Sequence, residues 1–182
     1  MSELIVVSFR DQFRAVDVLN ELRQRNWLWV GDLEDAVAVR LDDAGHAKVQ
    51  LSVDLSGRET VTWAGIWGSL LSVVLYLPTA EIMAEAADGV GHRMSREPEF
   101  LRSPIGTYPN ASWWRDELGI SDEFLRDVGA VIQTGTSAIL MIVRTQEVLT
   151  VLRQLYDYGS LVIHTTLTPE QDEKMGLFCG IT

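Results

Sequence analysis

Cysteine and clustered basic residues are scarce in this sequence. Its 182 residues include one cysteine, Cys179, which excludes an intrachain disulfide and a metal site built from several thiolates. Lys and Arg number 15 against 26 Asp and Glu, so the formal net charge is −11 at pH 7. A nucleic-acid surface needs clustered Lys and Arg to neutralise phosphates, and the sequence has no such cluster. We therefore expect no nucleic-acid partner. The lone cysteine suits a reducing cytoplasm, which is the expected location.

Catalytic, metal and cofactor motifs are missing as well. The three histidines, His46, His92 and His164, fall on a turn, a charged segment and a strand, so no two have ligand spacing on one element. Gly89-Val90-Gly91 lacks the preceding strand and the third glycine of a nucleotide-binding loop. No serine lies in a Gly-x-Ser-x-Gly elbow. We therefore expect no catalytic residue, no metal and no cofactor, and we favour a protein that is not an enzyme.

Apolar periodicity in the first third predicts a strand, a helix and a β-hairpin. Leu4–Phe9 is a short apolar run typical of a strand buried on both faces. Asp11 stands in a capping position before apolar residues at helical spacing, which predicts a helix. Residues 33–41 and 47–53 alternate apolar and polar side chains on either side of the turn sequence 42–45. This pattern indicates a hairpin with one core face.

The last third shows a similar pattern. Ser121 caps a predicted helix that carries two acidic residues in its first turn. Ser137–Val143 is almost wholly apolar, as expected for the centre of a sheet. Thr145 precedes a second helix that Gly159 should end, and a final strand is expected over residues 161–167. A short helix should then start at the Thr-Pro-Glu-Gln sequence that follows.

Two strand–helix–strand units are therefore expected, one in each half. Two such units with right-handed crossovers interleave into one four- or five-stranded sheet with helices on one face. The fold class expected is α+β, a ferredoxin-like (split βαβ) sandwich with an inserted apolar helix and an irregular loop insertion. The whole chain, 1–182, is expected to form a single domain. Its parts are a strand-helix-hairpin half (1–58), the apolar helix and insertion (59–118), and a helix-strand-helix-strand half (119–182).

One segment does not fit an ordinary sandwich. Val61–Ala80 contains no charged residue, and its length matches a membrane-spanning helix. A single crossing would place the two strand–helix–strand units on opposite sides of the membrane, so they could not share a sheet. Residues 81–102 carry too many charges for a second span. We therefore expect the segment to be buried in protein, either against its own sheet or against a partner subunit.

The insertion after the apolar segment gives further expectations. Glu81–Ala87 should continue as a helix, because alanine is a strong helix former. Pro104 and Pro109 should make residues 103–112 an irregular loop. The two tryptophans that follow, at 113 and 114, are then expected to have no regular element of their own. We expect them to anchor the loop by docking on the apolar helix or on a neighbouring subunit.

Several motifs together resemble a bacterial family of unknown function whose members are described as predicted membrane proteins. The motif Asp32-Leu33-Glu34-Asp35-Ala36-Val37 is followed by an apolar stretch that contains the pair Trp67-Gly68. An acidic helix start at residues 121–124, a strand at 137–140 and a Thr-Leu-Thr-Pro close come in the same order as in the family. Family members carry a Gly-rich apolar hairpin, of which the second arm is replaced here by the charged residues 81–118. The resemblance implies no activity, cofactor or catalytic residue.

The leading hypothesis is a non-enzymatic structural or assembly protein that forms a homo-oligomer through the apolar helix and a sheet face. The sequence has six tryptophans, and they cluster around the apolar segment. Tryptophan is enriched at subunit interfaces. The predicted interface residues are Trp63, Trp67, Leu70, Leu71, Val74, Trp113 and Trp114.

Two other hypotheses stay open. The first is a peripheral membrane protein at the inner face of the cytoplasmic membrane, in which residues 63–77 lie in the lipid interface. The second is a ligand-binding or enzymatic ferredoxin-like dimer, in which His164 or Asp35 faces a pocket. Asp35 is of interest because it shares parity with Leu33 and Val37, and a carboxylate that faces a core must be paired or hydrogen-bonded. That last hypothesis rests on analogy of fold, which does not determine function.

Overall fold

The computed structural model describes residues 2–25, 33–51, 67–71, 73–75, 82–85, 91–93, 113–159 and 161–179. Residues 67–71 and 73–75 are helical. The named elements, in chain order, are β1 (Ser2–Phe9), α1 (Arg14–Gln24), β2 (Leu33–Leu41), β3 (Ala47–Leu51), β4 (Ile82–Glu85), β5 (Gly91–Arg93), the π-helix η4 (Trp113–Glu117), α3 (Asp122–Val131), β6 (Ser137–Arg144), α4 (Val148–Tyr156), β7 (Leu161–Thr166) and α5 (Pro169–Cys179).

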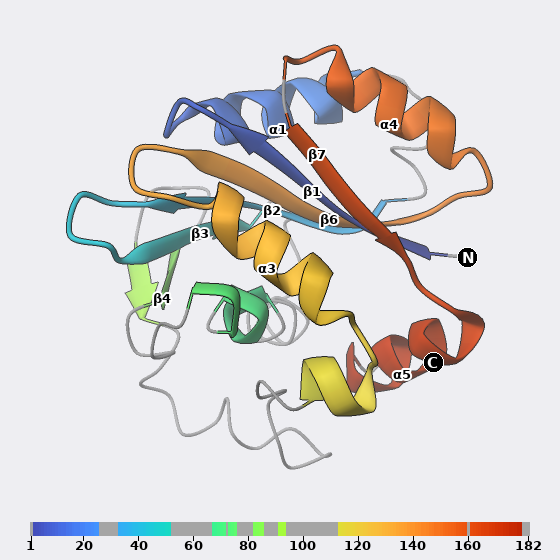
Figure 1. Ribbon diagram of the computed structural model, residues 1–182. Coiled ribbons are helices and arrows are strands. Elements are labelled where there is room, and N and C mark those ends of the chain that lie inside the picture. The colour runs from blue at the N-terminus through green and yellow to red at the C-terminus, as the bar shows by residue number, and fades with distance from the viewer. Residues whose placement is uncertain are drawn as a thin grey trace.

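The strands form one sheet in the order β5-β4-β3-β2-β6-β1-β7 (Figure 1). The five strands from β3 to β7 in this order pair antiparallel with their neighbours, whereas β4 pairs parallel with β3. The two strands of the unit β1-α1-β2 are separated by β6, and those of β6-α4-β7 are separated by β1. Both halves of the chain therefore contribute to one sheet. The mixed helix-and-strand architecture predicted from the sequence is confirmed.

The helices α1 and α4 lie together on one face of the sheet (Figure 1). They pack their apolar residues against Ile5 of β1 and Met141 of β6, both of which are fully buried. The N-cap residue of α1 is Phe13, whose side chain makes no cap hydrogen bond, and not Asp11 as predicted. Asp11 lies in the turn before the helix, where its Oδ1 accepts hydrogen bonds from the backbone N–H groups of Phe13 (2.7 Å) and Arg14 (3.0 Å). Each aliphatic side chain buried in this way contributes about 1.5–3 kcal/mol. This face of the sheet is therefore closed by the chain itself.

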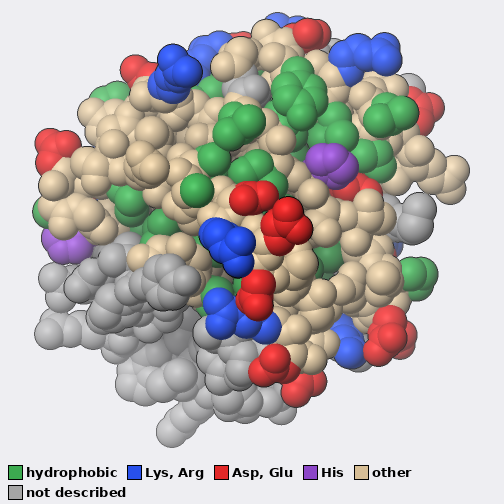
Figure 2. All heavy atoms as spheres, in the orientation of Figure 1, with side chains coloured by type: hydrophobic (Ala, Val, Ile, Leu, Met, Phe, Trp, Pro, Cys, Tyr) green, Lys and Arg blue, Asp and Glu red, His purple; other side chains and the backbone are tan. Residues whose placement is uncertain are grey.

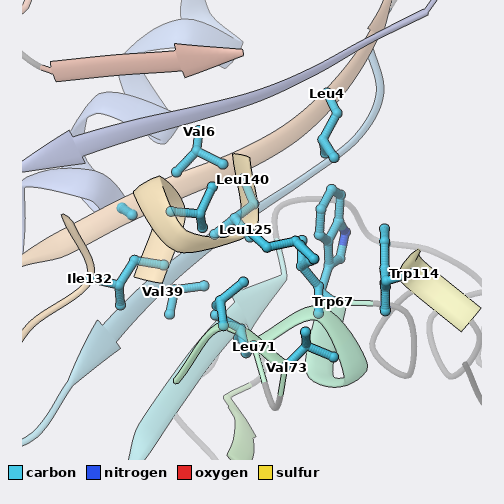
Figure 3. Packing of buried hydrophobic residues seen from close by; sticks show 14 of the residues in the cluster. Leu4, Val6, Val39, Trp67, Leu71, Val73, Trp114, Leu125, Ile132 and Leu140 are labelled. Atoms are coloured by element: carbon cyan, nitrogen blue, oxygen red, sulfur yellow. The ribbon is translucent and has the colours of Figure 1, made fainter. Parts of the chain in front are cut away.

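The other face is covered by the helical residues 67–71 and 73–75 of the apolar segment, together with α3 and η4 (Figure 3). Trp67 and Leu71 are fully buried and pack in one cluster with residues of β1, β2 and β6. Trp114 is also fully buried, and its Nε1 donates a hydrogen bond of 2.7 Å to Ser69 Oγ. The described part of the apolar segment thus packs against the sheet of its own chain, which is one of the two covers expected. Among the described residues, no helix is long and apolar enough to cross a membrane.

Two local expectations were wrong. The helix predicted over residues 81–87 is the strand β4 at Ile82–Glu85, which pairs with β3. A free edge on β3 outweighs the helix preference of a few alanines, which is worth only tenths of a kcal/mol per residue. Trp113 and Trp114 do have an element of their own, because they open the π-helix η4. The predicted loop at 103–112 lies outside the described residues.

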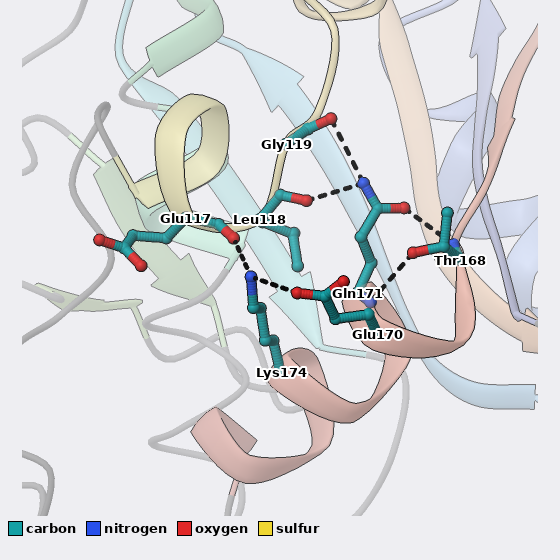
Figure 4. Close-up of polar contacts among 7 residues, drawn as sticks. All are labelled: Glu117, Leu118, Gly119, Thr168, Glu170, Gln171 and Lys174. Carbon is teal, nitrogen blue, oxygen red and sulfur yellow. Dashed lines mark hydrogen bonds and ion pairs between the residues drawn. The ribbon is translucent and has the colours of Figure 1, made fainter.

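Hydrogen bonds hold the helix α5 at its start and against the end of η4 and the turn that follows (Figure 4). The N–H of Thr168 donates to Gln171 Oε1 (2.8 Å), and the N–H of Gln171 donates to Thr168 Oγ1 (3.2 Å), which is a reciprocal capping box. Gln171 Nε2 also donates to the carbonyl of Leu118 (2.7 Å), and Lys174 Nζ donates to the carbonyl of Glu117 (2.9 Å). The helix α5 therefore starts as the sequence predicted and is tied to the turn after η4.

Candidate assembly edge at strand β7

The strand β7 is the outermost strand at one end of the sheet. It pairs antiparallel with β1, from Ser8 opposite Leu161 to Glu3 opposite Thr166, and the register is uninterrupted. Among the residues that the structure describes, no strand pairs with its other side. The backbone on that side of β7 is therefore the open edge of the sheet.

The direction of each backbone group in β7 follows from a single hydrogen bond. The N–H of Leu167 donates to the carbonyl of Ser2 at 2.8 Å, in the same register as the rest of the pair. In an antiparallel ladder, successive residues alternate between bonding to the partner strand and pointing away from it. The N–H and C=O groups of residues 161, 163 and 165 therefore bond to β1. Those of Val162, His164 and Thr166 point to the open edge.

The side chains of β7 lack the features that usually prevent an edge strand from pairing with another chain. Natural edge strands are protected by lysines, prolines, bulges or very short length. The sequence of β7, Leu-Val-Ile-His-Thr-Thr, has no proline, no lysine and no acidic residue. Leu161 is 56% exposed, and α4 adds two further exposed side chains, Leu149 and Tyr156. Figure 2 shows hydrophobic side chains gathered over β7 and α4. The edge thus combines unpaired backbone groups with apolar surface.

A buried carboxylate depends on a side chain of this same strand. The Glu3 side chain is only 2% exposed, and its Oε2 lies 3.2 Å from Nδ1 of His164. A buried carboxylate is stable only when it is paired or hydrogen-bonded. The imidazole is 39% exposed, so His164 lies between the buried Glu3 side chain and the solvent at the edge. The geometry suits a structural pair that holds β7 against β1.

The sequence had singled out His164 only as a residue that could face a pocket, and it missed Glu3. The available signal was an acidic residue with the same parity as Ile5 in a strand that is otherwise apolar. Asp35 lies opposite Ile142 of β6, next to a β-bulge, and its side chain is outside the described residues. Among the described residues, no three His, Cys, Asp or Glu side chains are grouped to hold a metal ion.

The predicted interface residues lie elsewhere in the fold. The side chains of the described ones lie in the hydrophobic cluster under the sheet, where Trp113 is partly buried. Trp63 lies outside the described residues. Their role between subunits stays a prediction. As packed here, the fully or nearly fully buried members contact their own chain: Trp67, Leu70, Leu71, Val74 and Trp114.

The comparisons with known proteins concern mainly the second half of the chain. Residues 111–177 match the model of a family described as "Protein of unknown function (DUF1269)". That range runs from just before η4 into α5 and includes β7. The match fits the expectation of a family of unknown function, while the 32–37 motif lies outside the matched range. No curated protein and no solved structure matches the chain.

Proposed function

We propose that this protein is a non-enzymatic assembly module that forms a homodimer by pairing the open edge of β7 with β7 of a second copy. The observation that carries the proposal is the unguarded edge, with the backbone groups of Val162, His164 and Thr166 pointing outward. The proposal places the dimer in the cytoplasm.

The symmetry of an antiparallel pair supports this arrangement. A strand that pairs antiparallel with its own copy has a two-fold axis, which is the commonest symmetry of homo-oligomers. With the axis at His164, Val162 of each chain lies opposite Thr166 of the other. The three outward residues of each chain then exchange about six backbone hydrogen bonds, each worth about 0.5–1.5 kcal/mol net. Burial of the exposed Leu161 side chains adds apolar area to this pairing.

In the part of the chain that the structure describes, both faces of the sheet are already covered. The order β7-β1-β6-β2 with split strand–helix–strand units supports the ferredoxin-like sandwich that we propose, which β3 and its neighbours extend. The helices α1 and α4 cover one face, and the described apolar segment with α3 covers the other. Assembly through the apolar helix would require these core contacts to be broken first. Assembly through the edge requires no such change.

The substitution Thr166→Pro tests the proposal. Thr166 is exposed and its N–H points outward, so proline removes a donor only from the open edge. We expect light scattering at micromolar concentration to show a dimer for the natural chain and a monomer for this variant. Thr166→Val is the matched control, because it keeps the N–H and the shape of the side chain and should stay dimeric. A natural chain that is monomeric at all concentrations would refute the proposal.

Hydrogen exchange gives a second readout at residue level. The amides of residues 163 and 165 should be protected in monomer and dimer alike, because β1 accepts their hydrogen bonds. The amides of Val162, His164 and Thr166 should become protected only in the dimer. Equal protection of both sets in a monomeric sample would show that something else in the chain covers the edge.

A further inference from the structure

A pocket of about 700 Å³ lies between α3 and the helical residues 73–75, away from the β7 edge. This volume is within the range of small-molecule sites, which is about 300–1,000 Å³. The pocket is open to solvent on one side. Its described lining is Leu41, Gly45, Val73, Val74, Leu75, Arg115, Asp122, Leu125, Arg126, Gly129, Ala130 and Ile132.

The two walls of the pocket approach each other closely at a glycine of α3. A Cβ added to Gly129 of α3 would lie 2.4 Å from the carbonyl oxygen of Val74, so only glycine allows this approach. The apolar floor includes Val74, Leu125 and Ile132, all of which are buried. The groove is therefore shaped by backbone contact and by packed core residues, and its floor should keep its form when rim residues are changed.

The pocket has a polar end and an apolar end. Asp122 and Arg126 stand one turn apart in the first half of α3, and Arg115 lies beside them. The other end is apolar, because Leu41 bridges to Thr134 just beyond the end of α3 and lines the pocket there. A ligand that lies along α3 would thus meet charged groups at one end and hydrocarbon at the other.

The described lining of the polar end carries two arginines, Arg115 and Arg126, and one aspartate, Asp122. Arg115 Nε lies 2.8 Å from Asp122 Oδ1, so these two charges compensate each other. Arg126 is exposed and makes no ion pair or hydrogen bond with any residue that the structure describes. The acidic side chain nearest to it at the rim, Asp122, is already paired. Among the described residues, nothing pairs with this guanidinium, and guanidinium binds carboxylate with two parallel hydrogen bonds.

We infer that this pocket binds a small amphiphilic carboxylate, with the carboxylate on Arg126 and the hydrocarbon body along α3 toward Leu41. The charge complementarity is with the unpaired guanidinium, and the apolar floor matches the hydrocarbon. Binding is reversible and involves no covalent step. The site is independent of the β7 edge, since the two share no residue.

Calorimetric titration of the full chain with sodium octanoate tests the inference, with octan-1-ol and acetate as probes for the tail and the head alone. Octanoate should bind measurably more tightly than either probe. Arg126→Gln should weaken octanoate binding about tenfold or more, because a charge-assisted pair is lost. Ala130→Trp should abolish binding, since Ala130 is an exposed lining residue and the indole would fill the groove.

Arg153→Gln is the matched control, because Arg153 is an exposed arginine on α4, on the opposite face of the sheet. It should leave octanoate binding unchanged. Circular dichroism melts of all three variants should match the natural chain, which shows that loss of binding is not loss of fold. The inference is overturned if octanoate does not bind, if octan-1-ol binds equally well, or if Arg126→Gln and Ala130→Trp leave the affinity unchanged.

Discussion

The two outer strands of the sheet differ in how they meet the solvent. At one end, β5 is only three residues long, Gly91–Arg93, and includes an arginine in its sequence. At the other end, β7 is six residues long and has no lysine, arginine, aspartate or glutamate. Short length and basic residues are common ways to prevent edge-to-edge pairing. The β5 edge therefore has the features of a protected edge, whereas β7 has those of a strand that accepts a partner.

The largest difference is expected when a proline is placed in each of the two outer strands and the losses of stability are compared. Thr165→Pro removes an N–H that bonds to β1, so it should cost about 3 kcal/mol or more of the free energy of unfolding. A proline at His92 in β5 should cost less than about 1 kcal/mol, since a three-residue outer strand carries little of the total stability. Urea unfolding measures both. Equal losses would mean that the two edges contribute alike to the fold.

A smaller loss is expected from His164→Ala, which leaves the Glu3 carboxylate buried without its partner. We expect a cost of about 1–3 kcal/mol, below that of a fully buried pair because the imidazole is partly exposed. The double variant Glu3→Gln with His164→Ala should recover part of this loss, because no charge is then buried. Additive losses in urea unfolding would contradict a direct interaction between the two side chains.

A pH effect is expected in the turn between β2 and β3, on the side of the sheet that leads to β5. Asp42, in the turn between β2 and β3, accepts hydrogen bonds from the backbone N–H groups of His46 (2.9 Å) and Ala44 (3.0 Å). The bond from His46, with the bond from Ala44, holds the pKa of Asp42 below its ordinary value of 3.8. The folded state therefore favours the carboxylate.

The stabilisation by Asp42 is present above pH 3.8 and is lost as the pH falls through the lower folded-state pKa. The protection factors of the amides in the β2–β3 turn, which are corrected for the intrinsic pH dependence of exchange, should fall over that range. Asp42→Asn is the control, because it cannot ionise and should remove the pH dependence from the turn. Persistence of that dependence in the Asn variant would assign it to another group.

The smallest effect on the single chain is expected from Leu161→Ser at the β7 edge. Leu161 is 56% exposed, so its replacement should change the stability of the monomer by no more than about 0.5 kcal/mol. It should nevertheless weaken the dimer, because apolar area is lost where the two copies meet. Leu149→Ser on α4 removes an exposed leucine beside the strand pair instead of within it, so it should weaken the dimer less than Leu161→Ser does. Light scattering and thermal melts of both variants would sharpen the contrast between fold stability and assembly.

Much of the local structure could be predicted from the sequence. Ser121 was expected to cap a helix, and its Oγ accepts the N–H of Phe124 at 3.2 Å. The run from Ser137 to Val143 was expected at the centre of a sheet, and β6 lies between β1 and β2 with these residues buried. Such features depend on side chains within a few positions of one another, so the pattern along the chain is sufficient to indicate them.

The candidate edge and the pocket could not be predicted in the same way. Val162, His164 and Thr166 point outward only because β1 happens to pair with the other side of β7. The pocket needs Gly129 to approach a backbone carbonyl of a segment more than fifty positions earlier in the chain. Periodicity describes which face of an element is apolar, but it does not tell which neighbour occupies that face or that edge.

The sequence alone determined the alternation of helices and strands and the hydrogen-bonded starts of α3 and α5. Only the tertiary structure decided that Ile82–Glu85 is a strand, that Glu3 meets His164 across 161 positions, and that β7 has a free edge. The physical reason is that caps and periodicity act through local hydrogen bonds and side-chain spacing. Strand partners and close helix contacts are instead chosen by competition among distant segments for the same backbone groups and the same apolar area.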